Sequence, residues 1–412
     1  MMQPLINITR KQAYLFAVFL VLYEFLTYIA NDMIMPGMIK VVESFHAPES
    51  AVASSLTAYV LGGASLQLIL GPVSDRYGRR PVMLIGVLLF FLCTIFIAFS
   101  HSMDQFIYAR FFQGMGLCFI GVIGYATLQE IFAEADAVKL IAIMANISIL
   151  APLAGPLLGS VFIHFFSWRL IFVSIAAFSL VALWGLWYKM PEPVGQIKKD
   201  GQEIKVTSLS PKVILQNYKQ LISHRGFLFG SFALGILTIP CICWIALAPV
   251  MLMANAKLTV MQYALWQVPV FGASILGNWV LHYLTGKCSL QKIIRIGSIL
   301  ILISLMMLCL LPIIINSTYI WFMPGFIIYF FSLGMTNGPL QRIILFATPV
   351  AKGTSSALMT MIMMCMLALG IEVANISYSL IGNIMFSFNA ALTFILYSLC
   401  AIITFRFISP KE

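Results

Sequence analysis

Twelve long apolar runs follow one another along the chain, and each is long enough to cross a membrane as a helix, which takes about 20 mostly apolar residues. Only 9% of the 412 residues are charged, whereas a soluble domain has about 25%. Too few polar side chains are available to cover a surface in water, which excludes a soluble enzyme, a secreted disulfide scaffold and a disordered chain. The sequence predicts an all-α integral membrane protein with twelve transmembrane helices. The predicted spans are residues 12–43, 50–72, 81–100, 104–128, 138–165, 168–189, 226–253, 261–285, 292–315, 319–347, 354–380 and 385–407.

One long polar stretch divides these spans into two sets of six. Residues 1–189 are predicted to form an N-terminal six-helix half and residues 226–412 a C-terminal one. Residues 190–225 are predicted to be a cytoplasmic linker with a short amphipathic helix near 211–222. Such an arrangement indicates a transporter built from two six-helix halves, whose substrate path lies between the halves near the middle of the bilayer. A channel or a receptor with twelve spans stays open, although the sequence has no K⁺-type selectivity filter.

Positive charge is distributed unevenly between the two ends of the spans. With the N-terminus in the cytoplasm, 20 of the 24 Lys and Arg residues fall in cytoplasmic segments, and only Lys40, Arg169 and Lys257 fall outside. Because Lys and Arg accumulate on the cytoplasmic side, we predict a multi-pass protein of the bacterial inner membrane with both termini in the cytoplasm. The net charge of +10 is explained as a sorting signal and a contact with anionic lipids, not as a nucleic-acid surface.

The loop predicted between spans two and three carries a dense motif of glycine, aspartate and arginine. The two glycines are expected to let the chain turn tightly at the membrane face. The aspartate is expected to cap a helix start or to face the N-terminus of a neighbouring helix, and the arginines to bind phosphates and carboxylates. A loop that served only to place positive charge in the cytoplasm would not need this particular spacing. The motif comprises Gly71, Asp75, Arg76, Gly78, Arg79 and Arg80.

Three ionisable side chains lie well inside predicted spans of the N-terminal half. Glu24 and Asp32 in the first span are separated by about 12 Å of helix rise and about 80° of turn, so both can face one cavity at two depths. Pro36 predicts a kink just beyond them. Arg110 in the fourth span costs at least about 2.5–3.5 kcal/mol in a membrane and therefore needs a partner. Gln113 lies one turn further on the same helical face.

The fifth span contains a glycine–proline motif, Pro152, Gly155, Pro156 and Gly159. Gly and Pro in a transmembrane helix permit close helix approach and a bend, and for the glycines packing alone is the favoured interpretation. The eight cysteines lack the spacing and the partner ligands of a zinc site. No phosphate-binding loop for ATP occurs. We therefore expect no metal, no cofactor and no enzymatic activity.

The loop motif, the Arg110–Gln113 pair and the glycine–proline motif together resemble the proton-coupled multidrug-exporter branch of the major facilitator superfamily. The resemblance runs along almost the whole chain. It implies proton coupling at Asp32 and Glu24, with Arg110 and Gln113 as charge partners, and a conformational role for the loop motif. The residues that it places around the substrate are Tyr28, Asn31, Asp32, Leu117, Met144 and Ser148.

This resemblance favours an antiporter that exports lipophilic, neutral and cationic drug-like compounds by alternating access. Proton and drug then compete for Asp32 or Glu24, with Glu372 and Arg342 as candidate secondary sites. Two alternatives stay open: a metabolite or siderophore exporter on the same fold, and a ligand sensor that does not transport. The expected partners are lipophilic drugs or toxic metabolites, protons and membrane lipids, with no nucleic acid, and the expected oligomeric state is a monomer.

Overall fold

The computed structural model describes residues 4–199, 201, 204, 211–285, 287–348, 350 and 352–408. In this part of the chain all regular elements are helices, and β pairing is limited to two isolated bridges. The prediction of an all-α protein is confirmed.

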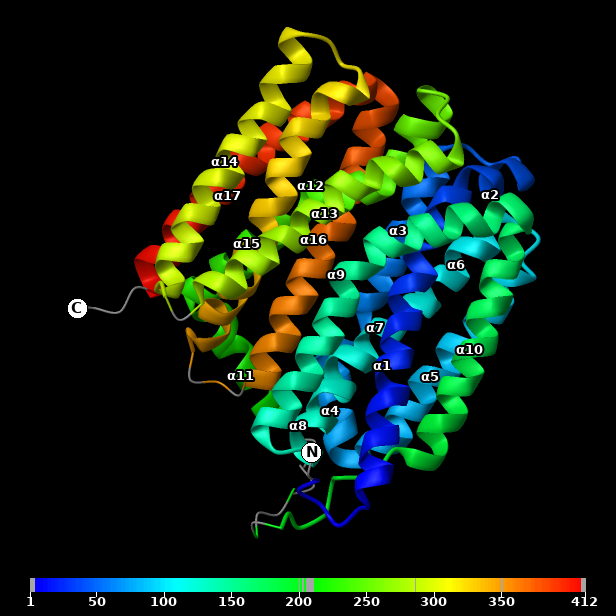
Figure 1. The fold of residues 1–412 in the computed structure, drawn as a ribbon. Coiled ribbons are helices and arrows are strands. Elements are labelled where there is room, and N and C mark those ends of the chain that lie inside the picture. The colour runs from blue at the N-terminus through cyan, green and yellow to red at the C-terminus, as the bar shows by residue number, and fades with distance from the viewer. Residues whose placement is uncertain are drawn as a thin grey trace.

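Helices α1 to α10 form the first packing group, coloured blue to green on the right of Figure 1. The bounds are α1 (Arg10–Asp32), α2 (Met38–Ser44), α3 (Ser50–Ser65), α4 (Gln67–Tyr77), α5 (Arg79–Ala98), α6 (Met103–Gly114), α7 (Gly116–Cys118), α8 (Tyr125–Ile131), α9 (Glu134–Phe165) and α10 (Trp168–Lys189). Within this group α1 packs against α9 and α10, α3 against α6, and α5 against α6 and α10.

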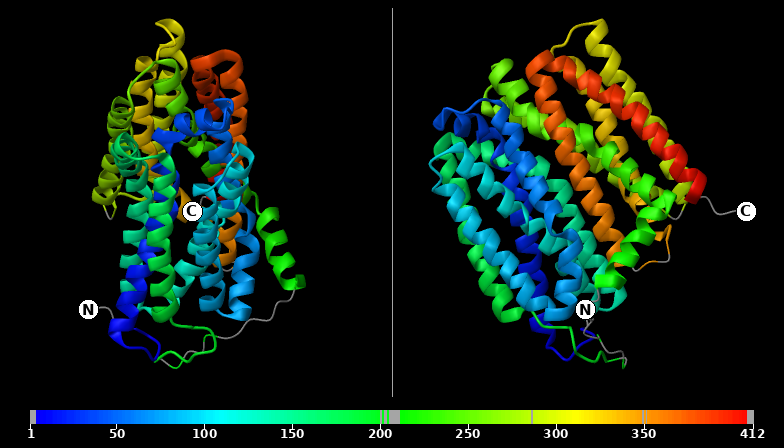
Figure 2. Two further views of the ribbon diagram at one scale, coloured as in Figure 1. Left: turned by 90° about the vertical axis from the view of Figure 1, so that its right-hand side faces the viewer. Right: turned by 180° about the vertical axis from the view of Figure 1, so that it is seen from behind.

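Helices α11 to α17 follow the polar stretch. The bounds are α11 (Pro211–Ser223), α12 (Arg225–Pro249), α13 (Val260–Leu284), α14 (Leu290–Ile314), α15 (Met323–Phe346), α16 (Lys352–Ile381) and α17 (Met385–Ile408). Helix α15 packs against α13 and α14, and α17 packs against α12 and α14. The two groups meet where α16 lies along α3 and α4 and where α13 contacts α9, as both views in Figure 2 allow the reader to follow. The boundaries at residues 190 and 225 stay a prediction.

The lengths and the hydropathy of these helices fit a membrane protein. Among the described residues, nine apolar helical stretches are long enough to cross a bilayer, and the bent pair of α3 and α4 makes a tenth. One of the nine, Gly353–Phe407, contains both α16 and α17, and α9 contributes the shorter apolar segment Leu150–Phe165. The helices are therefore consistent with the twelve predicted spans.

Polar caps define where several of these helices begin. The hydroxyl of Thr9 accepts a hydrogen bond from the backbone N–H of Gln12 at 3.1 Å, at the start of α1. At the start of α13, Thr259 and Gln262 form a reciprocal capping box. Such caps satisfy backbone N–H groups that a helix leaves unpaired in its first turn, so they mark the points at which the chain enters an apolar span.

The first span is kinked as predicted. Helix α1 ends at Asp32, a 3₁₀ turn covers Met35–Gly37 with Pro36 inside it, and α2 continues to Ser44. Proline breaks the regular hydrogen-bond ladder of a helix, which accounts for the change of geometry. The kink therefore begins immediately after the aspartate.

The motif between spans two and three is mostly helical, which corrects the prediction of a loop. Helix α4 runs through Gly71, Asp75 and Arg76 to Tyr77, and α5 begins at Arg79. Only Gly78 turns the chain, with φ of +102°, and a Cβ there would lie 2.5 Å from an oxygen of the Glu192 carboxylate. The expected glycine turn is thus right for Gly78 and wrong for Gly71.

The N-terminal segment and the start of the polar stretch lie at one end of the molecule, at the bottom of Figure 1. The backbone N–H of Lys199 donates to the Leu5 carbonyl, and that of Leu5 donates to the Ile131 carbonyl, both at 2.7 Å. We call this the linker end. The predicted amphipathic helix is confirmed as α11, and the Tyr218 hydroxyl of that helix donates to the Leu68 carbonyl at 3.2 Å.

Candidate functional site

A chain of buried polar side chains crosses the first helix group and ends at Asp32. Gln113 Nε2 donates to Thr94 Oγ1 at 2.8 Å, and Arg110 Nη1 donates to Gln113 Oε1 at 2.7 Å. Arg110 Nη2 donates to Asn31 Oδ1 at 2.5 Å, and Asn31 Nδ2 donates to Asp32 Oδ1 at 3.1 Å. Helices α5, α6 and α1 each contribute to this chain, so the charge on α6 and the carboxylate on α1 are linked through one amide.

Arg110 is held by neutral groups. Its side chain is 1% exposed, and its Nη1 also donates to the Ala30 carbonyl at 3.3 Å. Its guanidinium carbon lies 4.4 Å from the centre of the Tyr59 ring, a cation–π contact. Tyr59 is fixed in turn by a 2.5 Å hydrogen bond from its hydroxyl to the Thr27 carbonyl. Within the described residues no ion pair joins Arg110 to a carboxylate, and its Nε has no hydrogen-bond partner.

Asp32 faces a small cavity between the two helix groups. The cavity has a volume of about 10 Å³, which is about the space for one water molecule. The first group contributes Asp32, Met35, Pro152 and Pro156 to its wall, and the second contributes Ile245, Tyr263, Gln267 and Phe271. Asp32 and the two prolines of the glycine–proline motif therefore meet at the junction of the groups.

Gln267 brings polarity to this cavity from the second group. It is buried, its Oε1 accepts a hydrogen bond from Trp244 Nε1 at 2.8 Å, and its Nε2 has no partner among the described residues. An unpaired buried N–H is costly. Ordered water, a substrate or a rearrangement of the two helix groups can satisfy this donor.

The glycines of the motif on α9 permit close contact with α1. A Cβ at Gly155 would lie 2.5 Å from the Asp32 Cβ, and one at Gly159 would overlap the Met33 carbonyl oxygen. These contacts support the packing interpretation of the glycines. They also hold the backbone of Asp32 against α9, so the same motif that packs the helices positions the carboxylate.

Glu24 occupies a separate polar site on α1. Its carboxylate is fully buried, its Oε1 accepts a hydrogen bond from the Tyr125 hydroxyl at 2.8 Å, and its Oε2 has no partner among the described residues. Tyr125 directly follows a π-helical segment, Phe119–Gly124. Such segments recur at functional sites because they shift the register of the side chains that follow.

The motif at the linker end forms an ion-pair cluster around Arg79. Its Nη1 lies 2.5 Å from Asp75 Oδ1, and its Nη2 and Nε donate to the two oxygens of Glu130 at 2.8 and 3.2 Å. The N-terminus of α5 is capped by Glu192, whose oxygens accept the backbone N–H groups of Arg79 and Arg80 at 2.9 Å. Of the two expectations for Asp75, the cap is wrong, since Glu192 takes that position, whereas Asp75 does lie beside the start of α5 through its ion pair with Arg79.

The predicted substrate residues fall at several places around this core. Tyr28 is half-buried on α1, Leu117 is half-buried, and Met144 is fully buried on α9. A Cβ at Gly63 would lie 3.1 Å from Leu117 and 3.0 Å from the sulfur of Met364 on α16, so Leu117 lies at the boundary between the groups. The side chain of Ser148 lies outside the described residues.

The two candidate secondary sites lie apart from this cluster. Glu372 is half-buried on α16, and no hydrogen bond or ion pair of the described residues joins it to Asp32. Arg342 is exposed on α15, and its guanidinium carbon lies 5.2 Å from the centre of the Phe346 ring. In the described part of the chain no group of three or more His, Cys, Asp or Glu side chains gathers as a metal site.

Several residues of the site were not predicted from the sequence. They are Thr94, Tyr59, Tyr125, Gln267 and the carboxylates of Glu130 and Glu192. All but Glu192 are polar residues within or close to the end of an apolar span, which is the available signal, whereas Glu192 lies in the predicted linker. The sequence does not reveal which helix faces which, so it cannot identify their partners.

Comparison with known proteins places the chain in a family. The Major Facilitator Superfamily model matches residues 20–371. The chain is 45% identical to the multidrug transporter MdfA of Yersinia pestis bv. Antiqua (strain Angola) over 368 residues, which cover 89% of this chain and 88% of that protein. It is 42% identical to MdfA of Escherichia coli O157:H7 over 377 residues, which cover 92% and 90%.

Solved structures show the same fold. The crystal structure of a D-xylose–proton symporter matches with a TM-score of 0.75 at 16% identity and covers 96% of this chain and 98% of the symporter. An occupied, inward-facing bacterial homologue of the human lysosomal transporter Spinster matches with a TM-score of 0.73 at 13% identity and covers 97% of each chain. The relatives are transporters, which confirms that the chain is not an enzyme. The match of the family model and the identity to these relatives show that the chain belongs to the major facilitator superfamily, within the family of the MdfA multidrug transporters.

Proposed function

We propose that this protein exports lipophilic, neutral and cationic drug-like compounds in exchange for protons, by alternating access of its two helix groups. One observation carries the proposal: Glu24 and Asp32 are buried in the first span, and neither carboxylate forms an ion pair among the described residues. Acidic residues inside a membrane mark ion and substrate pathways. The relatedness to MdfA multidrug transporters supports the same function.

Asp32 is the proposed coupling site. It faces the cavity at the junction of the groups, which is where a substrate path in this fold runs. A proton neutralises the carboxylate, whereas a bound cation or hydrogen-bond donor favours its ionised form. Proton and drug therefore compete for one group. Proton uptake on the outer side and drug-induced proton release on the inner side complete the cycle, and no cofactor is required.

Arg110 is a positioning residue in this scheme. Its guanidinium keeps its charge and is bound on one side by Gln113 and on the other by Asn31. Because the oxygen of the Asn31 amide faces Arg110, its N–H₂ group is directed at Asp32. This orientation helps to hold the ionised carboxylate in place, and protonation of Asp32 weakens that bond. The state of the coupling site is thereby transmitted to α6.

Glu24 is the proposed second acid. Its Oε2, which has no partner in the described part of the chain, can accept a proton or approach a cationic substrate, while Tyr125 holds the other oxygen. Tyr28 lies between the two acids along α1, and together with Leu117, Met144 and Asn31 it is proposed to contact the drug.

The chain is a multi-pass protein of the bacterial inner membrane, and we place its linker end in the cytoplasm. Lys and Arg concentrate in the segments at that end. The Arg79 cluster then joins the cytoplasmic ends of α4, α5 and α8. We propose that this cluster braces the first helix group during the conformational change and that the protein works as a monomer surrounded by lipid.

The test measures proton release when a cationic drug is added to detergent-solubilised protein, together with drug accumulation in proteoliposomes under a pH difference. Asp32→Asn is expected to lose both. Asp104→Asn makes the same chemical change at an exposed position on α6 and serves as the control that keeps both.

Other outcomes of this test overturn parts of the proposal. If the Asp32→Asn/Glu24→Gln double variant still concentrates a drug against its gradient, coupling lies elsewhere, and Glu372 is the next residue to test. Drug binding without flux in the wild-type protein contradicts transport and indicates a sensor. Flux of metabolites alone indicates a metabolite exporter.

A further inference from the structure

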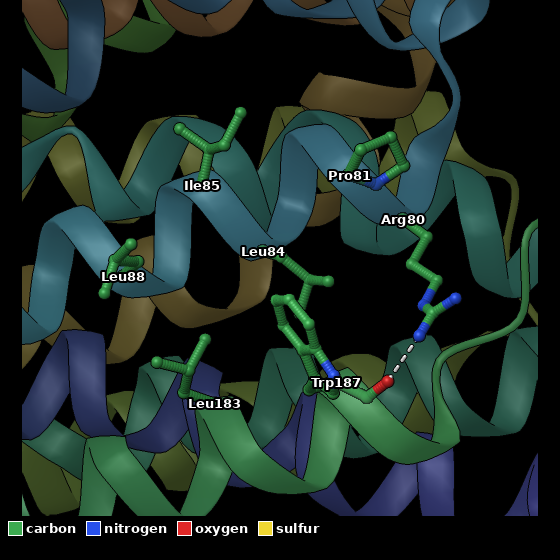
Figure 3. Close-up of a pocket in the computed structure, with 7 residues that line it drawn as sticks. All are labelled: Arg80, Pro81, Leu84, Ile85, Leu88, Leu183 and Trp187. Atoms are coloured by element: carbon green, nitrogen blue, oxygen red, sulfur yellow. Dashed lines mark hydrogen bonds between the residues drawn. The ribbon is translucent and has the colours of Figure 1, made fainter.

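A large apolar groove lies on the outer surface of the first helix group, between α5 and α10. Its volume is about 470 Å³, within the range of about 300–1,000 Å³ that is typical of small-molecule sites. Figure 3 shows the groove in close-up. Leu84 of α5 lies against Trp187 of α10, Leu88 and Leu183 lie further along the two helices, Ile85 projects away from α10, and Arg80 lies at one end. The groove is separate from the Asp32 cavity, with which it shares no lining residue.

Arg80 has unused hydrogen-bonding capacity at the end of this groove. Its Nη2 donates to the Trp187 carbonyl at 2.6 Å, the bond drawn in Figure 3. Its Nε is too buried to meet a ligand, but the residue as a whole is only half-buried, and no carboxylate of the described residues forms an ion pair with its guanidinium. The neighbouring Arg79 is instead fully paired with carboxylates. The charge of Arg80 is therefore available to an anion from outside the protein.

The position of the groove along the spans indicates what that anion is. Arg80 lies in the first turn of α5, and Trp187 lies in the last turn of α10, so the polar end is at the linker end of two spans. Trp184 and Tyr188 lie beside it with their ring centres 5.4 Å apart, and Trp and Tyr concentrate at the level of the lipid headgroups. The apolar side chains continue from that level towards the middle of the bilayer.

We propose that this groove binds one anionic phospholipid. Its phosphate contacts the Arg80 guanidinium, and one acyl chain lies along Leu84 and Leu88 against Trp187. Charge complementarity selects an anionic headgroup, because a zwitterionic lipid carries a cationic group beside its phosphate and a neutral drug leaves Arg80 without an anion. Lys189, the last residue of α10, adds positive charge at the same end. This site is distinct from the transport site and does not depend on the proposed function.

Native mass spectrometry of the full-length protein tests this site directly. The probes are phosphatidylglycerol and phosphatidylethanolamine with identical acyl chains. We expect the wild-type protein to retain one phosphatidylglycerol in preference to phosphatidylethanolamine. Arg80→Gln is expected to lower this retention about tenfold, since it removes a charge-assisted contact to phosphate. Arg295→Gln removes an exposed arginine on α14 and is expected to retain the lipid like the wild type.

A second pair of variants tests the apolar part of the groove. Ile85→Trp fills it at a position that is 62% exposed, so the fold should tolerate the change, and retention should fall. Leu92→Trp makes an equivalent change on the same helix, at a 53% exposed position that does not line the groove, and retention should persist.

A fluorescence measurement on the wild type keeps the proposal testable if Arg80→Gln does not fold. The signal of Trp187, defined by subtracting that of Trp187→Phe, should be quenched more by phosphatidylglycerol with brominated chains than by the brominated phosphatidylethanolamine. Equal retention of the two lipids by the wild type overturns the proposal. So does unchanged retention in a folded Arg80→Gln variant, or equal quenching of Trp187 by the two lipids.

Discussion

Two buried arginines in the first helix group are held in opposite ways. Arg79 at the linker end is bound by two carboxylates, and its Nη1 also donates to the Ser74 hydroxyl. Arg110 in the middle of the group is bound by amides, a backbone carbonyl and an aromatic ring. Both satisfy the requirement that a buried charge be hydrogen-bonded. Only Arg79 is also neutralised.

This difference separates a structural contact from a responsive one. An arginine whose ion pairs join its own helix to two others stabilises one arrangement of the helix ends. A different arrangement requires those pairs to break. An arginine that is hydrogen-bonded but not neutralised keeps an electrostatic influence on any carboxylate nearby. Asp32, linked to Arg110 through Asn31, is that carboxylate.

The largest expected effect comes from removing Arg110, the arginine that is hydrogen-bonded but not neutralised. Arg110→Ala is expected to abolish transport while the protein still inserts, because Asn31 and Gln113 lose their common partner. Arg110→Lys is also expected to transport poorly, since an ammonium group cannot span Gln113 and Asn31 as the planar guanidinium does. Efflux from cells is the measurement, and Arg295→Ala at an exposed site is the control. Normal efflux by a well-expressed Arg110→Ala variant contradicts the role of Arg110.

A variant that gives Arg110 an ion pair like those of Arg79 tests the comparison itself. Asn31→Asp places a carboxylate 2.5 Å from the Arg110 guanidinium and gives Arg110 the fixed ion pair that Arg79 has. We expect active efflux to fall by about tenfold or more, because a hydrogen bond to a charged group contributes about 1.5–3 kcal/mol and the link to Asp32 is lost. Drug-induced proton release should fall in parallel. Unchanged coupling in this variant shows that neutralising Arg110 has no consequence.

The ion-paired arginine should give a smaller effect of a different type. Asp75→Asn is expected to lower turnover by about twofold to fivefold with drug affinity unchanged, because Asp75 is partly exposed and such pairs contribute modestly. Glu130→Gln should reproduce the effect, since it contacts the same guanidinium. Turnover in proteoliposomes and equilibrium drug binding separate the two quantities. A loss of affinity instead of rate places this cluster in the drug path.

The sequence predicts the elements of this molecule far better than their contacts. The spans and the Pro36 kink follow from apolar length and from proline chemistry, which are local properties, and the structure has both. The expectation for Gly71 failed because helical geometry tolerates glycine and only Gly78 needs a positive φ. The role of Tyr59 could not be predicted, since it depends on the rotation of one helix against another, which apolar periodicity does not fix in a span that is apolar on all sides. The role of Glu192 could not be predicted either, because it depends on how the segment after α10 folds back onto the start of α5.

The smallest expected effect concerns Glu24, a carboxylate held by a neutral group just as Arg110 is. Tyr125→Phe removes the hydroxyl that donates to Glu24 Oε1 and leaves the ring in place. We expect efflux of a cationic drug to change by about twofold to threefold, the lower end of the effect of one hydrogen bond, because the Tyr125 hydroxyl can donate to the protonated acid as well as to the carboxylate. Efflux of a neutral drug should stay the same because a neutral drug has no charge for Glu24 to pair with. Glu24→Gln should show the same selectivity more strongly. The measurement is the ratio of cationic to neutral drug efflux in cells that express each variant, with Tyr108→Phe at an exposed position on α6 as the control. Equal losses for both drugs would mean that Tyr125 supports the fold of the first group rather than the charge of Glu24. Glu24 would then not be a responsive charge of the kind that Arg110 is.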